Sequence, residues 1–265
     1  ANTVATPQDP HAKLCSRAID DTTPATGTAE NYRSLVGALL YAATTTRADI
    51  SHAVGELSRY MSDPSEAHMT AALRVLRYLS GTRNHGITFS GSSLGDELTR
   101  GLPTTVRAYS DADFGADIDT RRSTTGFATF VGGGLVSWSS KRQPTVALST
   151  TEAEYMAMCF TAQDAVWIDR LLNEIGVDTT PFIIMEDNQS AIALSGDPKH
   201  HSRAKHIDIK YHYTRELIHD GKMTVEYCPT DEMIADTFTK ALPRATFVKY
   251  VDLMNIKEFK LGDGN

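Results

Sequence analysis

Four acidic residues occupy positions from which their carboxylates could converge on bound metal ions: Asp111, Glu154, Asp187 and Asp236. In chain order, the first and third end strand-like segments, and the second and fourth lie in helix-like segments. A single Asp at a strand end is more often a turn or cap residue, so the ordered set carries the prediction. Two divalent ions about 3.5 to 4 Å apart on a scissile phosphate need several such carboxylates. The pattern therefore predicts phosphodiester chemistry.

Three other acidic residues lie close to these four in the sequence, and we expect different roles for them. Asp113 would share the strand face of the first carboxylate and could support it indirectly. Glu152 has the capping-box spacing from Ser149, which explains it better than a metal does. Glu186 would point away from Asp187 if the strand continued through both residues.

The composition predicts a globular chain in an intracellular setting. Its 265 residues are 41% hydrophobic, which is enough for a substantial core. There is no apolar run of membrane-spanning length and no signal-peptide pattern at the start of the sequence. The three cysteines are far apart and lack metal-ligand spacing, so they indicate neither a disulfide framework nor a zinc site.

The net charge of −7 argues mildly against a nonspecific nucleic-acid binder. It does not exclude a nucleic-acid substrate, because metal-binding carboxylates count as negative in this sum and are offset once ions bind. Local basic patches can still contact phosphates.

The first part of the chain predicts a small helical unit. Residues 1–29 have no periodicity and suggest a poorly structured leader. Residues 30–90 repeat apolar residues at helical spacing, giving two helices and then a third that begins at Asp63. Residues 91–104 are rich in Gly and Ser and suggest a linker. Arginines along these helices could contact a nucleic-acid backbone or simply form a solvated face; they are Arg59, Arg74, Arg77 and Arg83.

The second part predicts a mixed five-stranded sheet flanked by helices, an α+β or α/β fold. The expected strands are 106–110, 127–131, 135–139, 182–185 and 223–227. The expected helices are one from Ser149 to about 175, one over 188–195, one over 207–218, and a last one from Asp231 through Asp236 to Leu242. Residues 244–265 are expected to form a C-terminal tail.

Seven strings in this part resemble the ribonuclease H domain of copia-type retrotransposon polyproteins. They are Tyr109–Phe114, Arg121–Gly126, Ser137–Gln143, Ala147–Tyr155, Glu186–Ser190, Lys205–Asp208 and Ala235–Lys240. Tyr32–Gly37 and Arg77–Thr82 resemble the segment after the reverse transcriptase palm, its thumb or connection. The resemblance spans Tyr32 to Ile256 and implies a ribonuclease H-like fold over residues 105–243.

The resemblance also implies an activity: endonucleolytic hydrolysis of the RNA strand of an RNA/DNA hybrid. Asp111, Glu154, Asp187 and Asp236 align with the metal-binding, catalytic carboxylates of the family. Two Mg²⁺ ions are expected, with Mn²⁺ as a substitute, because the ligands are hard oxygens. One ion would generate hydroxide from a bound water and the other would stabilise the departing oxygen. Selection of RNA would depend on 2′-hydroxyl contacts.

Substrate contacts are expected from two places. Asn188 and Gln189, next to the third carboxylate, are candidates for the minor groove of the hybrid. A basic stretch is the other candidate, through Lys199, Arg203, Lys205 and His206. Cellular ribonucleases H often carry a His in the loop before the last helix, but residues 228–232 contain none. That role is either absent or supplied from elsewhere, for instance by His206, although a lone His is more often structural.

No Tyr-x-Asp-Asp motif is present, so DNA synthesis by this chain is not expected. The partners implied are the hybrid and the palm and fingers portion of the same polyprotein, with no membrane. The expected location is the cytoplasm, in virus-like particles, or the nucleus, and the sequence leaves the oligomeric state open. Two alternatives remain: a catalytically silent binding module derived from a retroelement, and a related strand-transfer or exonuclease fold.

Overall fold

The computed structural model of the chain describes residues 2–16, 29–89, 104–179, 181–196 and 205–259, with only the backbone described for 205–211. These residues form two compact units. The sheet unit comprises residues 89–116 and 122–239. The helical unit comprises residues 1–88, 117–121 and 240–265. None of the described helices combines the length and apolar character needed to cross a membrane.

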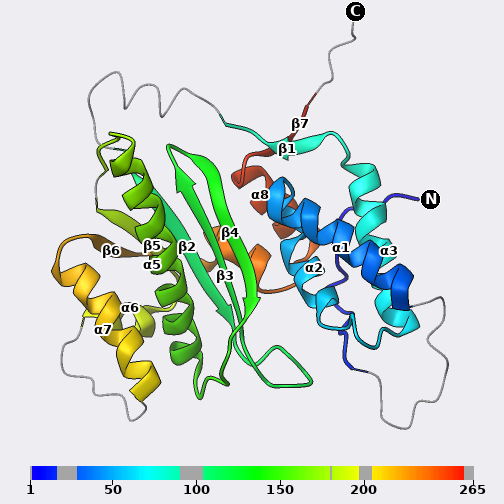
Figure 1. The fold of residues 1–265 in the computed structure, drawn as a ribbon, viewed down its shortest axis with the longest axis horizontal. Coiled ribbons are helices and arrows are strands. Elements are labelled where there is room, and N and C mark those ends of the chain that lie inside the picture. Colours follow the sequence, from blue (N-terminus) through cyan, green and yellow to red (C-terminus); the bar gives the residue numbers. More distant parts are fainter. Residues whose placement is uncertain (1, 17–28, 90–103, 180, 197–204, 260–265) are drawn as a thin grey trace, which may run out of the picture. The chain divides into compact units, whose positions relative to one another are not determined.

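The sheet unit contains a mixed five-stranded sheet in the order β4-β3-β2-β5-β6 (Figure 1). Strands β2, β3 and β4 form an antiparallel meander, while β5 pairs in parallel with both β2 and β6. The strands are β2 (Val106–Asp113), β3 (Thr124–Val131), β4 (Gly134–Arg142), β5 (Phe182–Glu186) and β6 (Met223–Tyr227). The expected fold class, a mixed five-stranded sheet flanked by helices, is confirmed.

The helices of the sheet unit are α5 (Thr150–Glu174), α6 (Gln189–Gly196) and α7 (Lys205–His219). Helix α5 begins as expected, because the hydroxyl of Ser149 accepts a hydrogen bond from the backbone N–H of Glu152 at 3.1 Å. The Glu152 carboxylate accepts from the N–H of Leu148 at 2.9 Å, which accounts for this residue as part of the cap.

One core cluster joins α5, α6 and α7 to the strands. It consists of buried residues with small or apolar side chains: Val106, Met158, Ala162, Ala165, Ile168, Phe182, Ile184, Ala191, Leu217 and Met223. A second, smaller cluster joins Ala112 of β2 to Ala153 and Ala157 of α5. These small side chains let α5 approach the sheet closely along its first turns.

The expected last helix, from Asp231 to Leu242, is wrong. The chain instead forms two short 3₁₀ turns, η2 (Thr230–Glu232) and η3 (Ile234–Phe238). Every side chain from Met233 to Thr239 is buried, so the segment has no polar face for an amphipathic α-helix to present to water. Segment η3 packs against β2 and β3.

The helical unit is built from both ends of the chain. Its helices are α1 (Ala29–Thr45), η1 (Ala48–Ile50), α2 (Ser51–Ser58), α3 (Glu66–Gly81) and α8 (Arg244–Leu253). The third helix begins at Glu66 rather than Asp63, after the backbone N–H of Ser65 donates to Nδ1 of His68 at 2.9 Å. A two-stranded antiparallel ribbon pairs β1 (His85–Ile87) with β7 (Ile256–Glu258).

Two expectations about the chain ends need correction. Residues 244–259 are no tail: Phe247 of α8 packs edge-on against Tyr78 of α3, with ring centroids 5.7 Å apart. Residues 2–16 lack regular helix or strand but are held in place, since Arg77 of α3 donates to the carbonyl of Asn2 at 2.7 Å. An aperiodic sequence can still be ordered by side chains that come from elsewhere. Residues 17–28 lie outside the described residues.

Candidate metal centre

Asp111 lies near the carboxyl end of β2, and its strand neighbours fix the direction of its side chain. Its antiparallel partner on β3 is Gly126. The alternate residues Val106, Ala108 and Ala112 are buried toward α5, whereas Tyr109 packs against the cluster around Met233 and Ala235. Asp111, two residues after Tyr109, therefore lies on the face of β2 that packs against η3, and it is 4% exposed.

Asp187 follows β5 directly, as predicted. Because β5 runs parallel to β2 with Tyr109 opposite Met185, continuing the register brings Asp187 level with Asp111. The carboxyl ends of adjacent parallel strands meet at one edge of a sheet, where ligands commonly bind. Asp187 also accepts a hydrogen bond from Thr230 of η2 at 2.9 Å.

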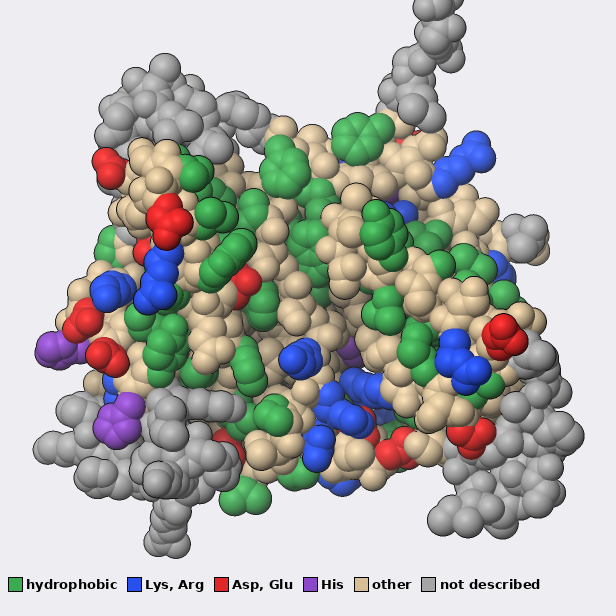
Figure 2. Space-filling model, viewed as in Figure 1, with side chains coloured by type: hydrophobic (Ala, Val, Ile, Leu, Met, Phe, Trp, Pro, Cys, Tyr) green, Lys and Arg blue, Asp and Glu red, His purple; other side chains and the backbone are tan. Residues whose placement is uncertain are grey.

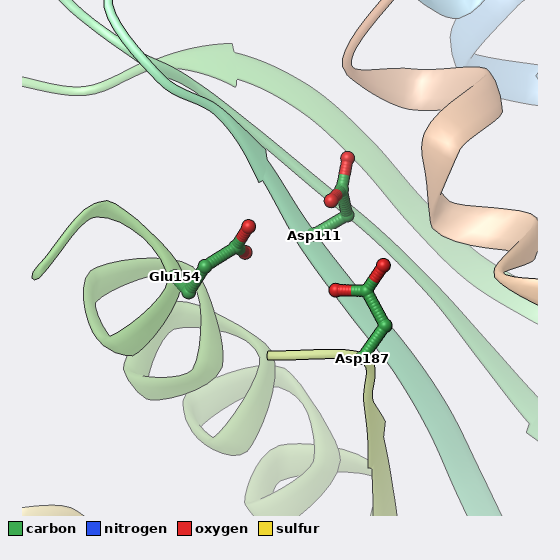
Figure 3. Close-up of side chains that lie close together, drawn as sticks. All are labelled: Asp111, Glu154 and Asp187. Carbon is green, nitrogen blue, oxygen red and sulfur yellow. The ribbon is translucent and has the colours of Figure 1, made fainter. Parts of the chain in front are cut away.

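Glu154 lies in the second turn of α5 and reaches the same edge. Its carboxylate accepts a hydrogen bond from the backbone N–H of Ala112, the residue after Asp111. One carboxylate oxygen from each of Asp111, Glu154 and Asp187 lies within 4.8 Å of the others. Figure 3 shows the three side chains pointing toward one another from a strand, a helix and a strand end.

The carboxylates of this cluster are buried close together, and the pKa values of two of them are raised. Burial raises the pKa of Glu154 to about 11, and the nearby carboxylates of Asp111, Glu186 and Asp187 act in the same direction. Burial also raises the pKa of Glu186, although the N–H of Asn188 donates to its Oε1 at 3.2 Å and opposes the shift. Repulsion among close carboxylates is relieved by a cation or by protonation.

The donor set fits a hard divalent cation. All three groups offer carboxylate oxygens, the ligand type that Mg²⁺ prefers. Within the described part of the chain, Oε2 of Glu154 is buried and accepts no hydrogen bond. A buried carboxylate oxygen left in this way is costly unless a cation or a proton meets it.

Asp236, the fourth predicted ligand, is placed differently. It lies on η3 and is 4% exposed, but it is not part of the group whose oxygens lie within 4.8 Å of one another. Its segment is nevertheless fixed to the site, because Thr239 donates its hydroxyl to Oδ2 of Asp111. The structure thus brings three of the four predicted carboxylates together and tethers the fourth by its neighbour.

Two threonines and one acidic residue beside the site were not predicted to contact it. Thr230 and Thr239 donate hydrogen bonds to Asp187 and Asp111. Glu186, which was expected to point away from Asp187, is fully buried, and its charge acts on Glu154. Thr230 lies a few residues after the end of β6, and Thr239 lies three residues after Asp236. Many threonines lie at such positions, so the sequence does not single these two out. Only the packing of η2 and η3 on the sheet distinguishes these two.

Only some of the residues predicted to contact the substrate have described side chains. Asn188 caps α6, since its Oδ1 accepts from the N–H of Ala191 at 3.0 Å, while Gln189 is exposed. Lys199 and Arg203 lie outside the described residues, and Lys205 and His206 begin α7 with only their backbones described. Lys and Arg side chains are exposed on the face drawn in Figure 2 despite the net charge of −7.

Three of the four helical arginines contact their own chain. Arg59 donates to Asp117 at 3.1 Å, Arg74 to the hydroxyl of Thr6 at 3.2 Å, and Arg77 to the N-terminal segment. These contacts order residues 2–16 and 117–121 within the helical unit. They account for these arginines without a nucleic-acid partner.

Comparison with known proteins finds long polyproteins among the relatives. The chain is 41% identical over 93% of its length to a retrovirus-related Pol polyprotein from transposon TNT 1-94 of Nicotiana tabacum. It is 41% identical over 97% of its length to the corresponding polyprotein from transposon RE1 of Arabidopsis thaliana. The chain spans 18% and 17% of these two relatives. No family model matches.

Among solved structures, the chain is similar to a ribonuclease H1 isolated from compost by a metagenomic approach. The match has 12% identity and a TM-score of 0.40, and it covers 56% of this chain and 98% of that one.

Proposed function

We propose that this chain is the ribonuclease H portion of a retrovirus-related Pol polyprotein, because it is similar over more than nine tenths of its length to two such polyproteins of transposons and spans less than a fifth of each. In this proposal the sheet unit hydrolyses the RNA strand of an RNA/DNA hybrid during reverse transcription. The helical unit corresponds to the thumb or connection segment that precedes it. The palm and fingers of the same polyprotein would be its partner.

The observation that carries this proposal is the convergence of Asp111, Glu154 and Asp187 at the carboxyl edge of β2 and β5. These three residues would hold divalent cations, with Asp236 as a fourth carboxylate supplied by η3. When bound, Mg²⁺ or Mn²⁺ would supply an activated water and offset the charge that develops on the phosphate. Glu154 must give up its proton for this, so cation binding is coupled to proton release.

Other residues of the chain would orient the site and the substrate. Thr230 and Thr239 hold the Asp187 and Asp111 carboxylates through hydrogen bonds. Gln189 is exposed beside the third carboxylate, where it could contact the minor groove of the hybrid. Lys199, Arg203, Lys205 and His206 are proposed to contact phosphates of the hybrid.

Cleavage of a labelled RNA/DNA hybrid tests the proposal. We expect Mg²⁺-dependent cutting of the RNA strand by the purified chain, and loss of at least about 100-fold in rate for Asp187→Asn, since the substitution removes one ligand charge. DNA duplex and single-stranded RNA serve as control substrates. A folded protein that cuts no hybrid with either Mg²⁺ or Mn²⁺ would instead be a silent binding module, and cutting of the DNA duplex would indicate a different nuclease class.

A further inference from the structure

We propose that Thr239 is a positioning residue of the metal centre, which holds the Asp111 carboxylate in its binding orientation and ties it to the segment that carries Asp236. This inference rests on the proposed function, because it concerns the same site. It adds a residue to the predicted set and gives that residue a defined task.

The contact is a buried bond between a hydroxyl and a carboxylate. Thr239 Oγ1 donates to Oδ2 of Asp111, and the two residues are 1% and 4% exposed. The carbonyl of Asp236 is also within 3.3 Å of the Thr239 hydroxyl. A hydroxyl has one proton to give, and an ionised carboxylate is the stronger acceptor. The bond to Asp111 is therefore the one that the hydroxyl makes.

A second link runs through the backbone. The N–H of Thr239 donates to the carbonyl of Asp236 at 3.2 Å. Thr239 thus holds η3 by its main chain and Asp111 by its side chain. Any displacement of this residue changes the distance between the Asp111 carboxylate and the η3 backbone that carries Asp236.

The sheet is shaped to receive this threonine. Gly126 lies directly opposite Asp111 on β3. A Cβ atom added at Gly126 would lie 2.6 Å from Cγ2 of Thr239, 2.8 Å from Cβ of Phe238 and 2.9 Å from the carbonyl oxygen of Ala235. Because Gly126 has no side chain, η3 packs directly on β3 at this position. Thr239 lies within hydrogen-bond distance of Asp111 as a result.

The bond restricts the orientation of the Asp111 carboxylate and leaves it able to bind a cation. A carboxylate has about four lone-pair sites, and the threonine takes one of them on Oδ2. The other sites stay available to a cation held by the ligand group that Asp111 forms with Glu154 and Asp187. Hydrogen bonds of this kind to metal ligands commonly change metal affinity by about 10- to 100-fold when removed.

Two substitutions separate the hydroxyl from the packing of the side chain. Thr239→Val keeps the branched shape that rests on Gly126 and removes the hydroxyl, whereas Thr239→Ser keeps the hydroxyl and removes the methyl. Thr129→Val is the matched control: Thr129 is also buried in this unit and donates to a carboxylate, Oδ2 of Asp164 at 2.8 Å, away from the ligand group. Thr239→Ala provides a second variant without the hydroxyl if the valine variant does not fold.

Two measurements on the full 265-residue chain give the readout. The first is the Mg²⁺ midpoint, the concentration that half-saturates the folded protein, obtained by fitting the gain in stability with Mg²⁺ concentration to RT ln(1 + [Mg²⁺]/Kd). We expect it to increase about 10- to 100-fold in Thr239→Val and to stay near the wild-type value in Thr239→Ser and Thr129→Val. The second is the crystal structure without metal, in which the Asp111 side chain should rotate away in Thr239→Val but not in Thr239→Ser or Thr129→Val.

The outcomes separate this inference from the proposed function. An unchanged Asp111 side chain and an unchanged Mg²⁺ midpoint in Thr239→Val would overturn the positioning role, even if the wild type cleaves the hybrid. If the wild type neither responds to Mg²⁺ nor cleaves, the proposed function fails, and the metal-free crystals alone decide the positioning role: a rotated Asp111 supports it and an unrotated one overturns it. A Thr129→Val variant with the same shift in midpoint as Thr239→Val would also overturn it.

Discussion

Glu154 combines two properties that stability alone would not favour. It is buried on α5 against the sheet, and its neighbours Asp111, Glu186 and Asp187 are carboxylates as well. Without a cation, the group must keep a proton or pay for desolvation and repulsion. Sites that carry such unfavourable charge arrangements are typically functional, because stability is given up for binding or catalysis.

A stability measurement checks this reading of Glu154. The unfolded chain should release its proton near the ordinary value of 4.5 and the folded chain only at about 11, so the folded protein holds more protons between these values. Its stability in EDTA should therefore fall as the pH rises above about 4.5. Glu154→Gln should raise the melting temperature at pH 8 by a few degrees, roughly 2 to 4 °C per kcal/mol, and abolish the response to Mg²⁺.

Glu152→Gln is the matched control for this substitution. Glu152 lies two residues earlier and is used by the helix cap rather than the site. This variant should keep the Mg²⁺ response and lose a little stability. A Glu154→Gln protein that is less stable than the wild type in EDTA at pH 8 would contradict the electrostatic account.

At the scale of elements, the 3₁₀ segment η3 carries Asp236 and is followed by Thr239, which hydrogen-bonds Asp111. An α-helix over Asp231–Leu242 would turn part of its side chains to water, but residues 233–239 are buried without a break. The short 3₁₀ turn puts Asp236 and Thr239 on the sheet within four residues. Gly126 makes this possible, because any side chain there would meet η3.

Gly126→Ala tests the contact between β3 and η3. The added methyl would meet backbone as well as side-chain atoms, so η3 must move, at a cost of about 1 to 3 kcal/mol in unfolding free energy. Hybrid cleavage should fall and the Mg²⁺ midpoint should rise, because Thr239 moves with η3. Gly196→Ala, in the same unit, is the control, since a Cβ there meets nothing within 4 Å. Equal behaviour of the two variants in melting and Mg²⁺ titration would refute the role given to Gly126.

At the scale of the whole molecule, the helical unit depends on chain segments from both ends. Helix α8 and strand β7 pack and pair with α3 and β1, more than 150 residues earlier in the sequence. These contacts make residues 244–259 part of the structure of the helical unit. A truncation before α8 would therefore leave α3 without the ring that covers Tyr78.

Phe247→Ala measures how much the packing of α8 on α3 stabilises the helical unit. Phe247 is 5% exposed and packs edge-on against Tyr78, so its loss should cost about 3 to 5 kcal/mol of unfolding free energy in the helical unit. The neighbouring Val248 is 53% exposed, and Val248→Ala should stay within about 0.5 kcal/mol of the wild type. Denaturant unfolding of both variants gives the comparison, and equal losses would show that α8 is not an integral part of the unit.

Much of this molecule follows from sequence patterns alone. Period-two and period-3.6 repeats are local, so all five strands of the main sheet, the long helix from Ser149 and the ends at Asp187 and Gly176 could be predicted. The order of Asp111, Glu154 and Asp187 along a strand, a helix and a strand end could likewise be predicted, because strand ends and helix starts fix where each carboxylate lies in its own element.

The tertiary structure decided what no local pattern encodes. The parallel register of β2 and β5 sets Asp187 level with Asp111, and the pairing of Gly126 with Asp111 opens the space for η3. The seating of η3 on the sheet placed Asp236 outside the close group of three and brought Thr239 onto Asp111. These contacts join residues far apart in the chain. Their geometry depends on strand register and side-chain packing, which exist only once the sheet has formed.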